Sequence, residues 1–333
     1  MRIGLAGTGR IGAFHADTLH RLDTVDSVVI ADIDAARAEA AAGKLGVEFA
    51  PSIDALFAAD LDGVVIAAAT GAHQELIGRG VAAGLPVFCE KPVAPDIAGT
   101  LAVLNTIGDA PVQIGFQRRF DAGYASARSL LASGALGWLH TIRANTFDPA
   151  PPPAEYIRTS GGFFRDCSVH DFDVLRWVTG REVAEVYAIG SNRGAEFFRK
   201  ADDVDTMGAV LTLDDDTIAL VSGTRYNAAG YDVRMELLGS ADSVSVGLDQ
   251  QLPLRSAETG ISWPTGPAHP TFIERFRTAY ETELREFTRV VAGETASPCT
   301  VRDALEAFYV AEACERSRRE HRPVRVDEVR VTG

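Results

Sequence analysis

The stretch "RIGLAGTGRIG", residues 2–12, decides the fold of this chain. An apolar run of strand character leads into a glycine-rich turn, and a helical pattern follows from about Ile11. Gly7, Gly9 and Gly12 have the G-x-G-x-x-G spacing, in which the glycines permit a tight turn, the approach of a pyrophosphate and close helix–strand packing. The stretch therefore predicts a dinucleotide-binding unit at the start of the chain.

An acidic residue at the end of the second predicted strand supports this interpretation. Asp32 lies 25 residues after Gly7, where a carboxylate accepts hydrogen bonds from the adenosine ribose of the cofactor. Asp34 adds negative charge and no arginine follows at once, which disfavours the 2′-phosphate of NADP. A helix-cap or turn aspartate would explain the residue type but not its position. The sequence predicts NAD as the cofactor.

Further along, apolar strands alternate with helical patterns up to about residue 118. Unbroken apolar strands of this kind are typical of a parallel sheet that is covered on both faces. We therefore expect a Rossmann NAD-binding domain over residues 1–118, with six or more mainly parallel strands. The strands readable from the sequence cover residues 2–6, 27–32, 62–69, 85–90 and 111–116.

The second half of the chain has longer strands with partial alternation of apolar and polar residues. They cover residues 138–147, 182–191, 205–213, 217–226, 232–240 and 242–248. This pattern predicts an α+β domain over residues 119–333 with a large, mostly antiparallel open sheet. Hairpins are expected near residues 214–216 and 239–242, and an extended loop over 148–156. Two helical patterns close the chain, near 271–292 and 300–319, and the second is a candidate to pack back on the first domain.

Composition and charge exclude several classes of function. The 333 residues carry a formal net charge of −14, which argues against nucleic acid or an anionic membrane as a partner. The most apolar run, residues 63–69, is too short to span a bilayer, and the first residues lack the apolar segment of a signal peptide. Four cysteines without a C-x-x-C pair indicate neither a disulfide framework nor a zinc site. We expect a cytoplasmic protein with reduced thiols.

Two further motifs carry residues suited to proton transfer. Glu90-Lys91-Pro92 ends a predicted strand, at the edge where open α/β sheets bind ligands. The stretch "GGFFRDCSVHDFDVLRW", residues 161–177, places Asp166 and His170 four residues apart in a helical pattern rich in aromatic residues. Residues at this spacing share one face of an α-helix. An imidazole can accept the proton that an alcohol loses on oxidation, and a neighbouring carboxylate can orient it.

With these motifs in order, the sequence resembles the glucose–fructose oxidoreductase and inositol dehydrogenase family (Gfo/Idh/MocA) over nearly its whole length. Within the family it is similar to bacterial myo-inositol 2-dehydrogenases. The stretches that carry this likeness are residues 115–124, 148–166, 170–177 and 230–244. A departure occurs at Thr70-Gly71-Ala72-His73, where the family usually has proline after the threonine. The resemblance implies NAD-dependent oxidation of a secondary alcohol of a cyclitol or sugar, with myo-inositol converted to 2-keto-myo-inositol (scyllo-inosose).

The resemblance also implies roles for individual residues. His170 is the proton acceptor, Asp166 a partner of the substrate or of the histidine, and Lys91 the second polar anchor of the reacting oxygen. A cis peptide is expected at Lys91-Pro92, no metal is expected, and the open sheet is expected to form a homotetramer or homodimer. The implied cofactor-binding residues are Gly7, Thr8, Gly9, Arg10, Ile11, Asp32, Thr70, His73, Glu90 and Lys91. The implied substrate-binding residues are Lys91, Arg119, Asp148, Asp166, His170 and Tyr231.

Other interpretations of the same residues remain open. His170 and Asp166 could be a core histidine and its salt-bridge partner, or His170, Asp171 and Asp173 could bind a metal. The chain could be another sugar or polyol dehydrogenase of the family, or a non-catalytic NAD-binding regulator. It could also be an NAD-retaining lyase or glycosidase on the same architecture. A regulator would not need Lys91, Asp166 and His170 together, so their joint presence weighs against that interpretation.

Overall fold

The computed structural model describes residues 1–331, so the last two residues of the predicted second domain, Thr332 and Gly333, lie outside the described residues. The chain forms two compact units: residues 1–117 with 278–305, and residues 118–277 with the chain from Glu306 onward. The chain passes from the first unit to the second after residue 117, one residue before the predicted domain boundary. The assignment of 278–305 differs from the sequence prediction, because Leu284, Phe287 and Val290 pack into the core of the first unit.

The first unit contains a six-stranded parallel sheet in the order β3-β2-β1-β4-β5-β6. Its strands are β1 (Arg2–Ala6), β2 (Ser27–Ala31), β3 (Glu48–Phe49), β4 (Gly63–Ile66), β5 (Val87–Glu90) and β6 (Val112–Gly115). This order reverses between β1 and β4, which is the point where doubly wound sheets bind dinucleotides. The predicted Rossmann fold is confirmed. Strand β3 was not predicted, since two residues are too few to make a pattern.

Three helices of the first unit begin at residues whose side chains cap them. Side chains of Asp34, Ser52 and Asp96 accept hydrogen bonds from backbone N–H groups in the first turns of α2, α3 and α5. The unit's helices are α1 (Arg10–Arg21), α2 (Ala35–Leu45), α3 (Ile53–Phe57), α4 (Thr70–Ala82), α5 (Ile97–Ile107), most of α10 (Phe272–Val291) and the start of α11 (Val301–Glu320).

The second unit contains a seven-stranded sheet in the order β12-β11-β7-β10-β9-β8-β13. Its strands are β7 (Leu139–Phe147), β8 (Val183–Ser191), β9 (Thr206–Leu213), β10 (Ile218–Thr224), β11 (Asp232–Gly239), β12 (Ser243–Val246) and β13 (Val324–Arg325). The predicted hairpins join β9 to β10 and β11 to β12. Among the described strands of this sheet, only β7 and β10 run parallel. The predicted mostly antiparallel sheet is confirmed.

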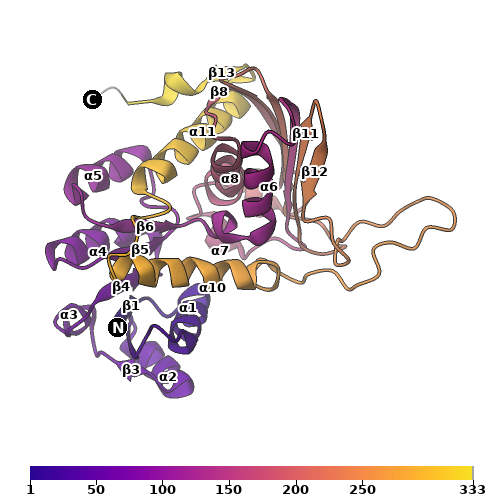
Figure 1. Ribbon diagram of the computed structural model, residues 1–333. Coiled ribbons are helices and arrows are strands. Elements are labelled where there is room, and N and C mark those ends of the chain that lie inside the picture. Colours follow the sequence, from indigo (N-terminus) through magenta and orange to yellow (C-terminus); the bar gives the residue numbers. More distant parts are fainter. Residues whose placement is uncertain (332–333) are drawn as a thin grey trace. The chain divides into compact units, whose positions relative to one another are not determined.

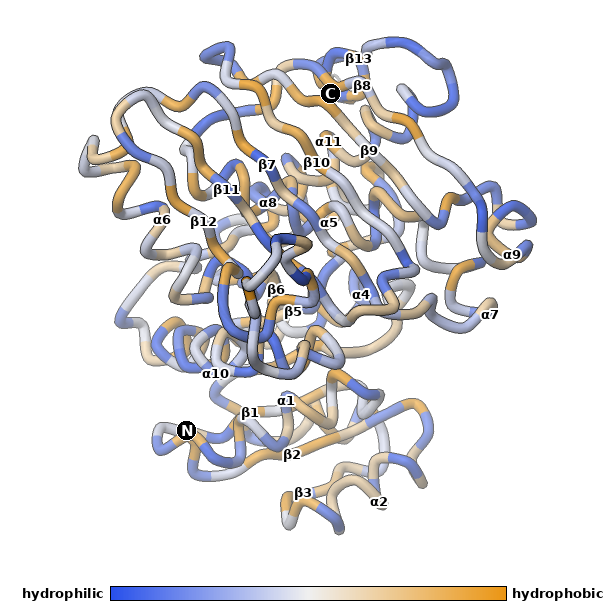
Figure 2. Tube along the Cα trace, turned by 90° about the vertical axis from the view of Figure 1, so that its right-hand side faces the viewer, coloured by the Kyte–Doolittle hydropathy of each residue, from blue (hydrophilic) through white to orange (hydrophobic). Residues whose placement is uncertain are grey.

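One face of this sheet is covered and the other is open. Along β7 the residues Ile142, Ala144 and Thr146 are buried, whereas Arg143 points to the opposite side and is exposed. Helices α6 (Ala122–Ala132) and α8 (Val169–Thr179) lie on the covered side, as Figure 1 shows. Hydrophilic and hydrophobic residues alternate along several of these strands, as the colours of the chain trace show (Figure 2). The short segments are η1 (Gln117–Phe120), α7 (Ala154–Ile157), η2 (Phe164–Ser168), α9 (Glu196–Lys200) and η3 (Val326–Val329).

Two local predictions need correction. The loop predicted over 148–156 ends early, because α7 begins at Ala154, directly after the last of its prolines. Asp166 and His170 do not share one regular α-helix. Asp166 lies in η2, a π-helical turn, and His170 lies in the first turn of α8. Such π turns are rare and occur frequently at functional sites. Within residues 1–331, the helices are all too short or too polar to cross a membrane.

Candidate active site

The glycine loop of the first unit has the geometry that a dinucleotide requires. Gly7 adopts φ = +100°, and a Cβ there would lie 2.6 Å from the carbonyl oxygen of Ala67. A Cβ on Gly12 would collide with the carbonyl oxygen of Gly7, so this glycine permits close packing of α1 on β1. A Cβ on Gly9 would meet nothing within 4 Å. The space beside Gly9, at the start of α1, is therefore open to a pyrophosphate.

Asp32, which directly follows β2, is held as a fixed acceptor. Its Oδ2 accepts hydrogen bonds from the backbone N–H of Thr8 at 2.6 Å and from the Thr8 hydroxyl at 3.0 Å. Its Oδ1 accepts from the backbone of Asp34 at 2.9 Å and from the Arg37 guanidinium at 2.5 Å. Burial alone would raise the pKa of Asp32, but these hydrogen bonds outweigh burial and lower the pKa to about 2. The carboxylate is ionised and oriented beside the glycine loop.

Arg37 was missed by the sequence reasoning, which considered only the residues immediately after Asp32. It lies in the first turn of α2, where Asp34 caps the helix, and the turn brings its side chain back to Asp32. Half of the Arg37 side chain is exposed. A half-exposed cation therefore lies directly beside Asp32 and forms an ion pair with it.

The Glu90-Lys91-Pro92 motif at the end of β5 is braced from two sides. Nε2 of His15, a fully buried residue of α1, lies 2.7 Å from Oε1 of Glu90. The His73 ring lies between the carbonyl oxygens of Pro92 and Ala68, at 2.7 and 3.0 Å. The Lys91-Pro92 peptide is cis, as predicted. His73 is only 1% exposed, so it supports the turn that carries Lys91.

The remaining predicted residues of the loop lie beside these. Arg10 and Ile11 form the first turn of α1, and Thr70 begins α4. These positions surround the carboxyl ends of β1 and β4 within the first unit, where dinucleotides bind in this fold. Their contacts with a cofactor stay predictions.

In the second unit the predicted acidic residues gather around a cation that the sequence reasoning missed. Arg225 donates from Nη1 to Oδ2 of Asp148 and from Nη2 to Oδ2 of Asp166, both at 2.7 Å. The Tyr156 hydroxyl donates to Oδ1 of Asp166 at 2.7 Å. Burial and the neighbouring Asp166 raise the pKa of Tyr156, so its phenol stays protonated. His170 lies four residues after Asp166 and is half-buried.

Arg119 and Tyr231 have structural partners of their own. The Arg119 guanidinium binds both carboxylate oxygens of Asp173, at 2.9 and 2.7 Å. Tyr231 is 6% exposed and its ring packs edge-on against Phe276. Burial raises the pKa of the Tyr231 phenol well above its ordinary value. Substrate contacts by Arg119 and Tyr231 therefore remain predictions.

The same geometry argues against the metal interpretation of His170, Asp171 and Asp173. Asp171 accepts from Arg118 at 2.5 Å and from Thr146 at 2.9 Å, and Asp173 accepts from Arg119. Both carboxylates are therefore already neutralised by buried arginines. In the described part of the chain, no group of three or more His, Cys, Asp or Glu side chains could hold a metal ion.

A Rossmann sheet, an open glycine loop and an oriented carboxylate directly after the second strand are typical of an NAD-binding oxidoreductase. Comparison with known proteins agrees. Residues 1–116 match the family model described as an oxidoreductase family with an NAD-binding Rossmann fold, and residues 124–245 match the GFO/IDH/MocA C-terminal domain. The chain belongs to the Gfo/Idh/MocA oxidoreductase family. It is an NAD-dependent dehydrogenase.

Relatives and solved structures cover nearly the whole chain. A myo-inositol dehydrogenase of Streptomyces leeuwenhoekii is 37% identical, over 95% of this chain and 97% of its own. A probable dehydrogenase from Thermotoga maritima superposes with a TM-score of 0.92 at 32% identity, covering 99% of this chain and 100% of that one. A scyllo-inositol dehydrogenase from Lactobacillus casei, solved with NAD(H) and scyllo-inositol, has a TM-score of 0.87 at 31% identity and covers 98% and 99%.

Proposed function

We propose that the chain oxidises one secondary hydroxyl of a cyclitol to the ketone with NAD as the acceptor, and that myo-inositol is the preferred substrate. The observation that carries this proposal is the polar cluster of the second unit, in which Asp148 and Asp166 both accept hydrogen bonds from Arg225. Asp166 precedes His170 by four residues. A cyclitol presents a hydroxyl donor on every carbon, and ionised carboxylates are strong acceptors. The names of the relatives support the same substrate class.

Each residue then has a defined task. NAD, when bound, supplies the acceptor for the hydride that leaves the alcohol carbon. His170 takes the proton from the alcohol oxygen, and the carbonyl forms as the hydride and the proton leave. Lys91 donates a hydrogen bond to that oxygen and stabilises its developing negative charge. Asp166 stabilises the imidazolium that results. The glycine loop and Asp32 hold the dinucleotide, and this chain's other polar groups orient the ring hydroxyls.

The test is a panel of cyclitols, cyclic sugars and open-chain polyols with NAD, in which NADH formation is followed. We expect the highest kcat/KM for myo-inositol. Turnover confined to sugars or open-chain polyols would assign the chain to another dehydrogenase branch of its family. Substrate loss without net NADH would identify an NAD-retaining lyase or glycosidase, and NAD binding without any turnover would identify a regulator.

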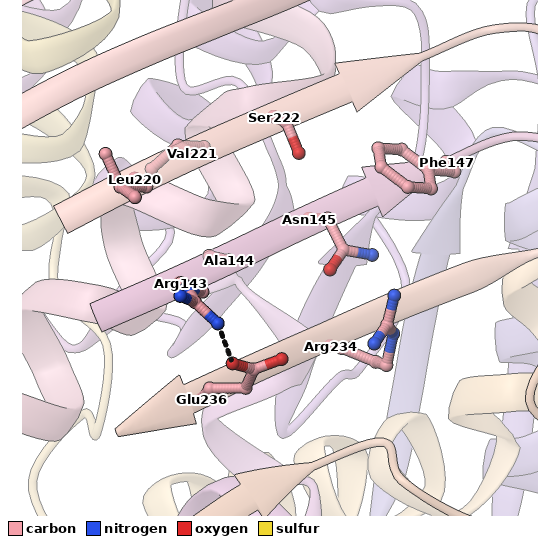
Figure 3. A pocket seen from close by; sticks show the side chains of 9 residues that line it. All are labelled: Arg143, Ala144, Asn145, Phe147, Leu220, Val221, Ser222, Arg234 and Glu236. Atoms are coloured by element: carbon pink, nitrogen blue, oxygen red, sulfur yellow. Dashed lines mark hydrogen bonds and ion pairs between the residues drawn. The ribbon is translucent and has the colours of Figure 1, made fainter. Parts of the chain in front are cut away.

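The open face of the second unit supports a further proposal, a homodimer or homotetramer formed through this sheet. Large apolar side chains lie there 40–55% exposed, namely Tyr187, Ile189, Val210, Ile218 and Leu220. Beside them is a groove of about 290 Å³ on β7, β10 and β11, lined by both polar and apolar side chains (Figure 3). Exposed apolar surface on a sheet is an aggregation hazard unless a partner covers it.

Light scattering at dilute concentration tests this assembly. A Val210→Glu substitution in the middle of the apolar surface should convert the assembly to monomers. Leu130→Glu is the matched control, because Leu130 is a similarly exposed apolar residue on α6, on the covered side of the sheet. A wild-type protein that is monomeric at dilute concentration would contradict the proposal. We also propose a cytoplasmic location, since Cys89, Cys167, Cys299 and Cys314 are buried thiols that form no disulfide.

A further inference from the structure

We infer that Arg225 is a positioning residue of the active site, which joins Asp148 and Asp166 into one rigid acceptor surface for the substrate, and that the Tyr156 hydroxyl completes it. This inference rests on the proposed function, since it assigns Asp148 and Asp166 to substrate recognition. It concerns residues of the second unit only.

The topology of the sheet brings the first two residues together. Asp148 directly follows β7 and Arg225 directly follows β10, and these two strands are parallel with Phe147 opposite Thr224. The carboxyl ends of parallel strands meet at the same edge of a sheet. The Asp148 N–H continues the ladder by donating to the carbonyl oxygen of Thr224 at 2.8 Å. The backbone therefore sets the spacing between Asp148 and Arg225 before any side chain contributes.

Arg225 is itself held from several directions. Its backbone N–H donates to the carbonyl oxygen of Asp205 at 2.8 Å, and its guanidinium lies 4.8 Å from the centre of the Phe163 ring. Only 7% of its side chain is exposed. A planar guanidinium in this position presents two nitrogens at a fixed separation, one to each carboxylate. Asp148 and Asp166 are thus held at a spacing that neither could keep alone, because like charges repel.

The net charge of this cluster indicates a role beyond stabilising the fold. One buried cation faces two carboxylates, so one negative charge is left over beside the segment that carries His170. That charge favours hydroxyl donors of a substrate and the imidazolium formed when His170 takes a proton. Both oxygens of Asp166 already accept hydrogen bonds, Oδ2 from Arg225 and Oδ1 from Tyr156. Asp166 therefore acts through its charge and position, and the proton acceptor is His170.

Tyr156→Phe is the sharpest test, since it removes one oxygen and keeps the ring. Its control is Tyr226→Phe, which deletes another hydroxyl of the second unit, one that accepts a hydrogen bond from the Ala195 N–H. A hydrogen bond to a charged group contributes enough that we expect roughly a 10-fold or larger fall in kcat/KM for the cyclitol in Tyr156→Phe. The kcat/KM of Tyr226→Phe should stay within about 2-fold of the wild-type value, because its hydroxyl bonds a neutral backbone N–H. The KM for NAD should be unchanged in both.

Arg225→Lys keeps the positive charge but replaces the fork by a single ammonium, which cannot hold both carboxylates in the same way. We expect the KM for the cyclitol to rise by roughly 10-fold or more. The ratio of kcat/KM between myo-inositol and scyllo-inositol should also change, and the KM for NAD should not. A merely structural salt bridge would alter the denaturation midpoint and leave the stereoisomer ratio intact.

The inference is wrong if Tyr156→Phe loses no more activity than Tyr226→Phe, or if Arg225→Lys folds and retains the wild-type stereoisomer ratio. If Arg225→Lys does not fold, Tyr156→Phe decides alone. Failure of the proposed function is a separate result, because it would be seen in the wild-type protein as an absence of NADH formation with every cyclitol.

Discussion

Asp32 in the first unit and Asp166 in the second are both buried carboxylates with every oxygen hydrogen-bonded, yet they are held in different ways. Asp32 is held by Thr8 at the glycine loop and by Asp34 and Arg37 just after it, all within the first strands and helices of the chain. Asp166 is held by Arg225, 59 residues later in the chain. A site built from neighbours can be recognised from sequence spacing, whereas a site built across a sheet depends on topology.

The largest expected effect is on the rate of the reaction, and it distinguishes proton transfer in the second unit from NAD binding in the first. His170→Ala should lower kcat by about 10²–10⁴-fold, because it removes the general base, while NAD affinity stays near the wild-type value. Lys91→Ala should be at least as damaging, since it removes both a positive charge and a donor to the reacting oxygen. Steady-state kinetics together with NAD titration of each variant measure both quantities.

The wild-type rate of alcohol oxidation should rise with pH as the imidazole loses its proton, and His170→Ala should lose this dependence. A His170→Ala variant with near-normal turnover and an unchanged pH profile would move the proton acceptor to another residue. Such a result would also contradict the assignment of proton transfer to the second unit.

A second prediction concerns stability. Arg118 and Asp171 are each about 2% exposed and lie 2.5 Å apart. Asp171→Asn should cost about 3–5 kcal/mol of unfolding free energy, because it leaves the Arg118 charge buried without its partner. The exposed pair Arg79 and Asp54, 2.7 Å apart, is the control, and Asp54→Asn should cost less than about 1 kcal/mol. Urea denaturation checks both values, and equal costs for the two variants would contradict the prediction.

The nucleotide-binding region could be predicted from sequence because its determinants are local. Glycine spacing, apolar strands and Asp32 all fall within the first βαβ unit, and the structure confirms the fold that they indicate. Strand alternation likewise predicted the antiparallel sheet. The spacing of Asp166 and His170 was recognised, but not the π-helical turn between them, since no residue pattern distinguishes such a turn from an α-helix.

Arg225 could not be predicted, because its role depends on the parallel pairing of β7 with β10. Nothing in either strand specifies which neighbour it will pair with. The same limit applies to residues 278–305, because an amphipathic helix shows an apolar face but not the core into which that face packs.

A third prediction sharpens the role of Asp32 in cofactor choice. Asp32→Ala should weaken NAD binding by roughly 10- to 100-fold, since hydrogen bonds to a charged acceptor contribute about 1.5–3 kcal/mol. It should also improve the use of NADP, because the repelling carboxylate is gone and Arg37 is released to face the 2′-phosphate. The KM values for NAD and NADP provide the measurement.

The double variant Asp32→Ala/Arg37→Ala is the control for this third prediction. It should lose the gain in NADP use and retain the weak NAD binding. Equal NADP affinity of the single and double variants would exclude a role for Arg37. A wild-type protein that used NADP better than NAD would overturn the assignment of Asp32.

The smallest effect tests whether the local hydrogen bonds of Asp32 stabilise the first unit without a cofactor. The pKa of Asp32 is about 2 in the folded chain and near 3.9 in an unfolded one, so its contribution is present above pH 4 and lost as the pH falls toward 2. Asp32→Asn should therefore cost roughly 1–2 kcal/mol at pH 7, because solvent screens the share contributed by the half-exposed Arg37. Denaturation of wild type and variant from pH 7 to pH 2.5, without NAD, should show the two stabilities converging below pH 4. A gap that stays constant over this range would mean that Asp32 contributes through its shape rather than its charge.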